Sequence, residues 1–210
     1  VLFRSLSIIF VITMNDKGGV YVKKELTEWL IAIAVGIILV ILIINFVAKS
    51  YTIKGDSMNP TLKDGDHVLV NIIGYKVGTV KKGNVIVFHA NQKDDYVKRV
   101  IGTPGDKVYY RDDQLIINGK KVKEPYLEYN MKRKQGEYIT GSLDIKDLAG
   151  AKHNSNVIPQ HKYLVLGDNR EVSKDSRAFG LIDEKQIVGK VSLRFWPLTD
   201  FKFNFNPDMS

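Results

Sequence analysis

Cysteine is absent from the 210 residues of the chain, so the protein has no disulfide, no cysteine-ligated zinc site and no cysteine nucleophile. This absence does not identify a compartment, because extracytoplasmic proteins can also dispense with disulfides. Extremes of composition are missing as well. The chain is 44% hydrophobic and 26% charged, with 17 Gly and 6 Pro, which excludes the disordered, collagen-like and disulfide-scaffold classes.

Acidic residues are outnumbered by basic ones: 23 Asp and Glu stand against 31 Lys and Arg, a net charge of +8. This excess favours anionic partners such as phospholipid headgroups or polyanionic wall polymers. Nucleic acid is not an expected partner, because no homeodomain, zinc-finger or aromatic RNA-binding signature accompanies the charge. No metal is expected either, since HExxH is absent. Strand or surface positions are expected for the four histidines, which are His67, His89, His153 and His161.

One segment is not typical of a globular protein. Residues 29–48 read WLIAIAVGIILVILIINFVA, a run of 20 residues without a charge. A helix needs about 20 such residues to cross the hydrocarbon core of a membrane, so the run predicts a transmembrane anchor. One alternative is a buried core helix, which would be shorter and carry a polar face. The other is a cleavable secretion signal, whose apolar region of about 7–15 residues is followed by a small-x-small site that is missing here.

The anchor divides the chain into three predicted parts. Residues 1–28 form an N-terminal segment, residues 29–48 the anchor and residues 49–210 a β-rich domain. Lysines flank the span on both sides in nearly equal numbers, so the positive-inside bias does not orient it. Residues 1–13 are apolar but too short to cross a membrane. Because Met14 would make a natural start, we expect residues 1–13 not to be native sequence.

The part beyond the anchor is expected to be mainly β. It is long enough for a single core, and it contains short runs of β-branched and aromatic residues between turn signals. These predicted strands are residues 67–73, 84–89, 96–101, 107–110, 114–117, 162–166 and 189–195. Asn118 and Gly119 predict a two-residue hairpin turn, and no helical periodicity of useful length follows the anchor. Residues 130–160 are more polar, which suggests an insertion or surface excursion.

The first cluster with chemical potential is the sequence GDSMNPTLKDGD at residues 55–66. Ser57 follows Ala48 by nine residues, which at about 3.3–3.6 Å per residue keeps it within about 30 Å of the end of the apolar run. Gly55 permits close backbone approach and unusual dihedral angles beside the serine. Taken alone, such a serine is more often a turn residue than a nucleophile, because a nucleophile also needs a nearby base.

Lys98, in the sequence YVKRVIG, is the candidate base. On a strand it shares a face with Tyr96 and Val100, whereas Arg99 points to the other face. Burial in such surroundings disfavours the ammonium form, and lowering the pKa from ~10.4 to about 8 requires about 3 kcal/mol. A neutral Lys98 amine could then accept the proton of Ser57. The alternative is that one of the two cations, Lys98 or Arg99, is simply an exposed strand side chain.

The third cluster is the loop GDNREVSKDSR at residues 167–177, which contains several charged side chains and two serines. Ser173 is placed to hydrogen-bond the Lys98 amine and hold it towards the serine nucleophile. Asp175 and Arg177 are expected to pair and brace the loop, the support that a well-ordered site needs. The alternative reading of an isolated charged loop is a solvated turn.

Together these clusters resemble those of one family, the bacterial type I signal peptidases, which are Ser–Lys dyad proteases. The matching segments occur in the family's order and are SMNPT from Ser57, GDHV from Gly65, YVKRVIGTPGD from Tyr96 and GDNREVSKDSR from Gly167. The resemblance covers about residues 21–207, and the sequence between the motifs is similar to that of the staphylococcal, Gram-positive enzymes.

The resemblance implies two antiparallel β-sheet regions on a single N-terminal transmembrane helix, with the catalytic domain outside the cytoplasmic membrane. It implies cleavage of signal peptides from exported preproteins after small residues in an Ala-x-Ala pattern. Preproteins are then the substrates, and anionic membrane lipids and the protein export machinery are expected contacts. No cofactor is expected.

The resemblance also implies roles for individual residues. Ser57 is expected to be the nucleophile, Lys98 the general base and Ser173 the residue that orients the lysine, with Asp175 and Arg177 as the structural pair. The residues expected to line the substrate cleft are Ile53, Leu62, Tyr96 and Val97.

The oxyanion hole departs from the pattern of many Gram-negative members, which have a hydroxyl residue two positions before the nucleophile. Gly55 occupies that position here. The hole is therefore expected to use the Ser57 N–H and another backbone or solvent donor near Gly55.

Two alternative functions remain open at the level of sequence. One is another kind of Ser–Lys protease, such as a self-cleaving repressor, against which the anchor and the loop at residues 167–177 argue. The other is a catalytically inactive, membrane-anchored β-domain that acts as a binding protein. The presence of both Ser57 and Lys98 argues against it.

Overall fold

The computed structural model describes residues 21–73 and 80–205 of the chain. The predictions made for residues 1–13 therefore lie outside the described residues. The chain divides into two compact units, one that ends at Ile44 and a second from Asn45 onward.

Helix α1 (Tyr21–Val47) contains nearly all of the uncharged run, which is therefore helical as predicted. Its 27 residues correspond to a length of about 40 Å, and its large apolar side chains from Trp29 to Ile41 are exposed. Within residues 21–73 and 80–205, however, no helix combines the length and apolarity that a membrane span requires. The predicted transmembrane anchor is thus not confirmed.

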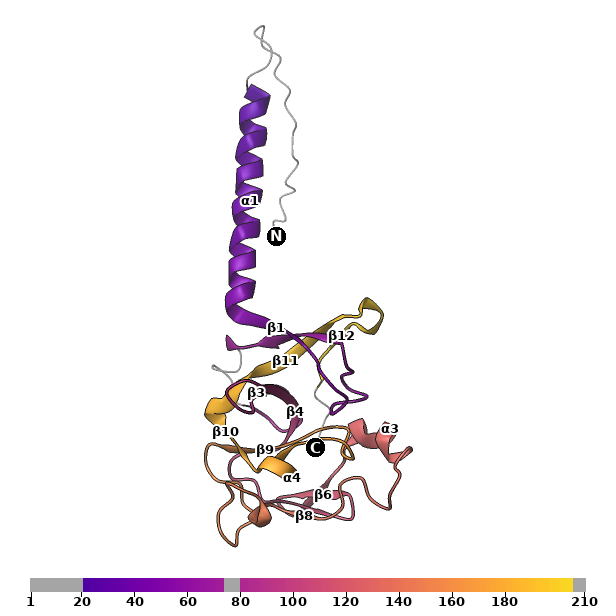
Figure 1. Cartoon of the computed structure of the whole chain (residues 1–210). Helices are drawn as coiled ribbons and strands as arrows, with labels where there is room; N and C mark the ends of the chain where they lie inside the picture. Colours follow the sequence, from indigo (N-terminus) through magenta and orange to yellow (C-terminus); the bar gives the residue numbers. More distant parts are fainter. Residues whose placement is uncertain (1–20, 74–79, 206–210) are drawn as a thin grey trace, which may run out of the picture. The chain divides into compact units, whose positions relative to one another are not determined.

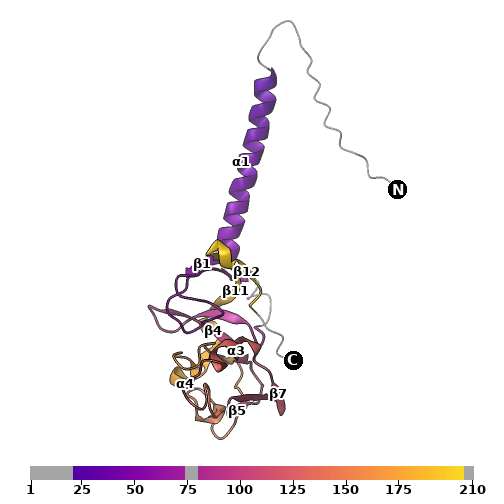
Figure 2. The same cartoon turned by 90° about the vertical axis from the view of Figure 1, so that its right-hand side faces the viewer.

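The second unit is built mainly of antiparallel β-sheet, as predicted (Figure 1). The spatial order of the larger sheet is β1 (Ala48–Thr52), β2 (His67–Asn71), β11 (Ile187–Trp196), β3 (Val85–His89), β4 (Asp95–Gly102), β9 (Lys162–Leu166) and β10 (Ile182–Asp183), with β12 (Lys202–Phe203) paired to β11. The order of the smaller sheet is β7 (Lys120–Val122), β6 (Gln114–Ile117), β5 (Val108–Arg111) and β8 (Leu143–Asp144). Within the β-domain, the smaller sheet lies at the end opposite to β1 and β12 (Figures 1 and 2).

Within residues 80–205, helical structure is confined to short segments. Two are single-turn α-helices, α3 (Glu128–Met131) and α4 (Ser176–Phe179). The others are 3₁₀ turns, namely η1 (Pro125–Leu127), η2 (Ile145–Asp147), η3 (Glu184–Gln186) and η4 (Leu198–Asp200). This agrees with the lack of helical periodicity beyond α1.

All seven predicted strands are present in the structure. Strands β6 and β9 have the predicted bounds, and the other five shift at their ends. The predicted hairpin is confirmed, because Ile117 pairs with Lys120 across Asn118 and Gly119. Both turn residues have positive φ, 52° and 81°, as a tight two-residue hairpin requires.

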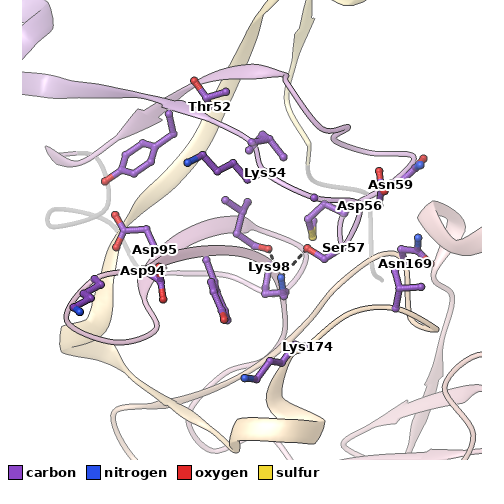
Figure 3. Close-up of a pocket in the computed structure, with 18 residues that line it drawn as sticks. Thr52, Lys54, Asp56, Ser57, Asn59, Asp94, Asp95, Lys98, Asn169 and Lys174 are labelled. Atoms are coloured by element: carbon purple, nitrogen blue, oxygen red, sulfur yellow. Dashed lines mark hydrogen bonds between the residues drawn. The ribbon is translucent and has the colours of Figure 1, made fainter.

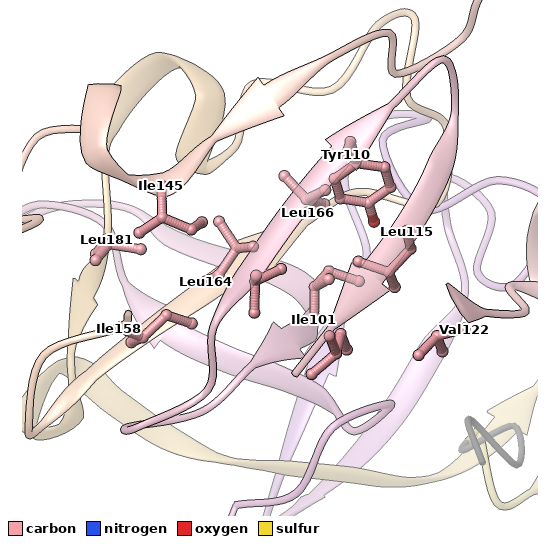
Figure 4. Packing of buried hydrophobic residues seen from close by; sticks show 11 residues of the cluster. Ile101, Tyr110, Leu115, Val122, Ile145, Ile158, Leu164, Leu166 and Leu181 are labelled. Atoms are coloured by element: carbon pink, nitrogen blue, oxygen red, sulfur yellow. The ribbon is translucent and has the colours of Figure 1, made fainter. Parts of the chain in front are cut away.

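The largest apolar cluster lies between the smaller sheet and strand β9 (Figure 4). Its fully buried members include Tyr110 and Leu115 from the smaller sheet and Leu164 from β9. Strand β9 thus contributes to this cluster with one face and, through Tyr163 and Val165, to a second cluster with the other. Alternation along one strand therefore joins the two sheets through a shared element.

The interpretation of residues 130–160 as an insertion or surface excursion needs a correction in one respect: most of the segment is exposed or half-buried, but it also contributes to the core. Ile139, Ile145 and Ile158 from this segment are buried, and Ile145 and Ile158 belong to the largest cluster. The segment looks polar because its apolar residues are widely spaced. Three of them, Ile139, Ile145 and Ile158, nevertheless fill positions in the interior, whereas Met131, Tyr138 and Val157 are exposed.

This correction can be tested through Ile145, which is completely buried. Replacement by alanine removes buried methyl and methylene groups and leaves a cavity, so Ile145→Ala is expected to lower the free energy of unfolding by about 2–5 kcal/mol. Urea denaturation would measure the change. In the matched control Val157→Ala, the side chain is 40% exposed, and the loss is expected to stay below about 1 kcal/mol. Equal losses in the two variants would contradict the assignment of Ile145 to the core.

Candidate active site

Ser57 lies in the loop between β1 and β2, which apolar side chains fix to the domain. Met58 and Leu62 of the loop, with Ile53 before it, are buried in one apolar cluster with strand β2. The Ile53 N–H donates to the Asp66 carbonyl at 2.8 Å and closes the base of the loop. Ser57 itself is only half-buried, so its hydroxyl is presented to solvent from a firmly packed loop.

Lys98 on strand β4 reaches the serine. Its Nζ lies 2.8 Å from Ser57 Oγ and 3.0 Å from the Val97 carbonyl oxygen (Figure 3). Lys98 is 4% exposed and the adjacent Arg99 is 1% exposed. The alternative that one of these cations is merely an exposed strand side chain is therefore wrong.

Burial sets the charge state of Lys98. It lowers the pKa of the amine from 10.5 to about 8, because a buried ammonium loses its hydration. The carboxylates of Asp175 and Asp168 act in the opposite direction but do not cancel this effect. A substantial fraction of Lys98 is consequently neutral at slightly basic pH and able to accept a proton.

The loop at residues 167–177 packs directly against the serine. The Asn169 N–H donates to the Ser57 carbonyl oxygen at 3.0 Å. Gly167 makes this approach possible, since a Cβ at that position would collide with Ser173 and with the Ser57 carbonyl oxygen. The cluster is thus not a solvated turn but one wall of the site.

Asp175 and Arg177 form the expected ion pair within this loop, with Arg177 Nε 2.9 Å from Asp175 Oδ1. Asp175 also accepts the Gly167 N–H at 3.0 Å. Burial raises the pKa of the Asp175 carboxyl, but the hydrogen bonds and charge of Arg177 outweigh it, so the net pKa is below the ordinary value. The carboxylate therefore stays ionised and fixes the turn on which Gly167 approaches Ser57.

Ser173 does not make the expected hydrogen bond to Lys98. Its Oγ is buried without a hydrogen-bond partner in the part of the chain that the structure describes. The lysine Nζ is instead directed at Ser57 and Val97. The role of Ser173 in orienting the lysine remains a prediction.

Ser57 and Lys98 lie in the wall of a cleft of about 760 Å³. Three of the four predicted substrate-contacting residues, Ile53, Tyr96 and Val97, line it. Leu62 does not: it is completely buried in the cluster beneath the serine loop. The turn at residues 57–61, in which the Leu62 N–H donates to the Met58 carbonyl at 3.0 Å, is followed directly by the buried Leu62, whose contribution is to the packing of the loop.

Polar side chains also border the cleft, with Asp94 and Asp95 at one end and Asn59 and Asn169 at the other (Figure 3). Gly55 lines the cleft with a φ of +78°, and its N–H donates to Asp64 Oδ1 at 2.7 Å. This N–H is thus occupied. Among the described residues, no backbone carbonyl is recorded as accepting from the Ser57 N–H.

Sequence reasoning missed the buried ion pair between Arg99 and Asp168, whose two nitrogen–oxygen contacts are 2.8 and 2.6 Å. Thr61 donates to the same carboxylate at 2.5 Å. The pair joins the strand of Lys98, the loop of Ser57 and the loop at residues 167–177. The available signal was Arg99 itself, next to Lys98 in a strand with apolar neighbours. If such an arginine is buried, its guanidinium requires a carboxylate partner.

A second missed pair connects the smaller sheet to the same loop. Arg170 Nη2 lies 2.6 Å from Glu124 Oε1, and both side chains are buried. The Tyr110 and Tyr126 hydroxyls donate to the same carboxylate. Because these residues are far apart in sequence, no spacing pattern could have predicted the cluster.

Across residues 21–73 and 80–205, no group of three or more His, Asp or Glu side chains is arranged to hold a metal ion. Two of the histidines, His89 and His161, instead contact single carboxylates at exposed positions.

Known proteins are similar to this chain in both sequence and fold. The family model described as "Signal peptidase, peptidase S26" matches residues 26–196. Signal peptidase IB of Staphylococcus aureus (strain MRSA252) is 68% identical over 186 residues, which are 89% of this chain and 97% of the relative. Signal peptidase I of Bacillus caldolyticus is 47% identical over 161 residues, which are 76% of this chain and 86% of the relative.

A crystal structure of a signal peptidase I from Enterococcus faecalis V583 superimposes with a TM-score of 0.50 at 33% identity, covering 55% of this chain and 98% of that one. The family model thus matches most of the chain, and the staphylococcal relative matches almost end to end. The chain therefore belongs to the signal peptidase family, peptidase S26, as a type I signal peptidase of the Gram-positive kind.

Proposed function

We propose that the protein is a membrane-anchored serine endopeptidase that cleaves signal peptides from exported preproteins after small residues, with Ser57 as nucleophile and Lys98 as general base. The observation that carries the proposal is the 2.8 Å distance between Ser57 Oγ and a buried amine whose pKa is about 8. A nucleophile within hydrogen-bond reach of its base is the arrangement that covalent catalysis requires.

In the first step the neutral Lys98 amine takes the Ser57 proton as Oγ attacks the carbonyl carbon of the scissile bond. The carbonyl oxygen becomes an oxyanion, which needs hydrogen-bond donors at the position where the charge develops. The Ser57 N–H is the donor that this account assigns. Because the Gly55 N–H is held by Asp64, the second donor is solvent or another group of the cleft.

In the second step the tetrahedral intermediate collapses and the bond to the leaving amine breaks. The Lys98 ammonium returns its proton to that amine, which leaves as the new N-terminus of the mature protein. A water molecule then gives a proton to Lys98 and attacks the ester, releasing the signal peptide and regenerating Ser57. The same side chain thus acts alternately as base and acid.

The cleft suits an extended polypeptide. It is bordered by the end of β1 and by β4, so a substrate segment can add to the sheet by main-chain hydrogen bonds while its side chains sort into pockets. Ile53, Tyr96 and Val97 supply apolar walls near the serine. Selection of small residues in an Ala-x-Ala pattern rests on similarity to the family and on these walls.

The loop at residues 167–177 is assigned the task of keeping the dyad in position. Its Asn169 N–H holds the Ser57 carbonyl, and the Asp175–Arg177 pair fixes its turn. Ser173 is proposed to accept a hydrogen bond from the Lys98 amine when the substrate displaces the present contacts. Such positioning holds the reacting groups close to the geometry that the reaction requires.

Anchoring is proposed from the uncharged run at residues 29–48 and from the exposed apolar side chains of α1. Ser57 is the ninth residue after Ala48, which keeps the nucleophile within about 30 Å of the end of that run. A preprotein that is itself held by its apolar signal segment would meet the cleft at this depth. The proposed location is the cytoplasmic membrane, with a single span, an extracytoplasmic domain and contacts to anionic lipids and the export machinery.

The dyad can be tested by mixing the full-length protein with a preprotein that carries an Ala-x-Ala site. Ser57→Ala and Lys98→Ala are each expected to lower kcat by roughly a thousandfold or more, because either change removes a group that acts in bond formation. Ser155→Ala and Lys121→Ala are matched controls outside the cleft and are expected to keep wild-type rates. Wild-type cleavage by either dyad variant would contradict the assignment, and binding without cleavage by the wild type would favour the inactive binding domain.

The pH dependence of cleavage tests how Lys98 is activated. Lys98 must be neutral to accept a proton, so kcat/KM should rise about tenfold per pH unit below pH 8 and level off above it. Initial rates over pH 6–10 at constant ionic strength would measure this limb. A limb centred near the ordinary lysine value of 10.5 would mean that Lys98 is solvated and that burial does not activate it.

A further inference from the structure

Asn130 on helix α3 belongs to none of the sequence motifs, yet it contacts two of the loops that form the site. Its Nδ2 donates to the Asn59 carbonyl oxygen at 2.9 Å and to the Asp168 carbonyl oxygen at 2.9 Å. One amide group therefore bridges two segments that are more than 100 residues apart in sequence.

The two carbonyls belong to the two loops that meet at Ser57. Asn59 follows Ser57 by two residues in the same loop. Asp168 precedes Asn169, whose N–H donates to the Ser57 carbonyl, and its carboxylate holds Arg99 next to Lys98. Figure 3 shows Asn59 and Asn169 at the same end of the cleft, beside Ser57. A shift at either carbonyl would thus be transmitted to the nucleophile or to the strand of the base.

Helix α3 has no buried residue of its own, but the segment that leads into it is well fixed, so Asn130 can act as a rigid clamp. Leu127, just before the helix, is buried, and the ring of Tyr126 lies 4.1 Å from the Arg99 guanidinium carbon. Tyr126 also donates to Glu124, the partner of Arg170. The helix is therefore held through the same buried charges that hold the site.

The chemistry of the contact favours asparagine. The NH₂ group of an amide has two hydrogens, which is the number needed for two carbonyl acceptors. An ionised aspartate of nearly the same shape has no donor and would face two carbonyl oxygens with a negative charge. Alanine would leave both carbonyls without this partner.

We propose that Asn130 is a positioning residue for the proposed reaction: it clamps the Ser57 loop against the loop at residues 167–177 and so keeps Ser57 Oγ next to Lys98 Nζ and water away from the amine. This proposal rests on the proposed function. It makes a segment outside the motifs part of the machinery that sets the geometry of the dyad.

The proposal has two separable consequences. A loosened clamp misplaces the nucleophile, and displacements of about 1 Å can cost on the order of a hundredfold in rate. A loosened clamp also admits water to Lys98, which raises its pKa toward the ordinary value and moves the rising limb of the pH profile upward. A residue that only stabilised the fold would lower the thermal midpoint without moving this limb.

The test compares Asn130→Ala and Asn130→Asp with wild type in the full-length protein in detergent, using a preprotein with an Ala-x-Ala site. Both variants are expected to lose at least tenfold in kcat with KM changed less than about threefold, and to shift the rising limb above pH 8. Asn156→Ala is the matched control. It removes hydrogen bonds of similar number, to Asp144 and from the Lys146 N–H, at a place that does not line the cleft.

Wild-type kcat and an unmoved limb in both Asn130 variants would overturn the proposal. So would a loss of activity that only follows a lowered thermal midpoint and is matched by Asn156→Ala. The Ser57→Ala variant distinguishes a failure of the proposed function, because cleavage that survives in it contradicts the dyad. In that case an NMR titration of Lys98 in the uncharged variant Asn130→Ala, without substrate, still decides: a raised midpoint supports the clamp, and an unchanged midpoint refutes it.

Discussion

The burial of one amine beside one hydroxyl is the constraint on which the rest of the structure depends. A lysine side chain in water is protonated at neutral pH and cannot accept a proton. Lys98, by contrast, is only 4% exposed and lies 2.8 Å from Ser57 Oγ. Burial lowers the pKa of Lys98 to about 8 against the opposing charges of two carboxylates. The fold must therefore bear the cost of placing this amine in an apolar strand, and it must keep the serine loop within reach of it.

Buried ion pairs connect the elements that meet this requirement. Arg99 and Asp168 join the strand of the lysine to the loop at residues 167–177, and Arg170 and Glu124 join that loop to the smaller sheet. Such pairs add little net stability, because desolvation offsets their attraction, but removal of one partner leaves an uncompensated buried charge. The two ion pairs therefore fix the relative positions of the elements that they connect. The uncharged amide of Asn130 adds hydrogen bonds to the Ser57 loop and to the loop at residues 167–177.

Much of the β-domain could be predicted from sequence, because its strands alternate and its turns use residues that tolerate positive φ, such as Asn118 and Gly119. Short strands such as β8 and β10 were missed, since two residues carry no periodicity. Ser57 and Lys98 could be recognised as a candidate pair from local motifs. Arg99 with Asp168, and Asn130 with its two carbonyls, could not, because their partners are set by tertiary packing. Tertiary packing also explains the result for Leu62. Its position in the motif predicted that it lines the cleft, but in the structure it is buried in the core.

The most direct test of this account is an NMR titration of the Lys98 side chain in the full-length protein without substrate, assigned by comparison with Lys98→Arg. The account predicts a midpoint near pH 8, set by burial next to Ser57. A midpoint near 10.5, the ordinary value for lysine, would contradict it, because the amine would then be charged and solvated at the pH where it is required to accept a proton.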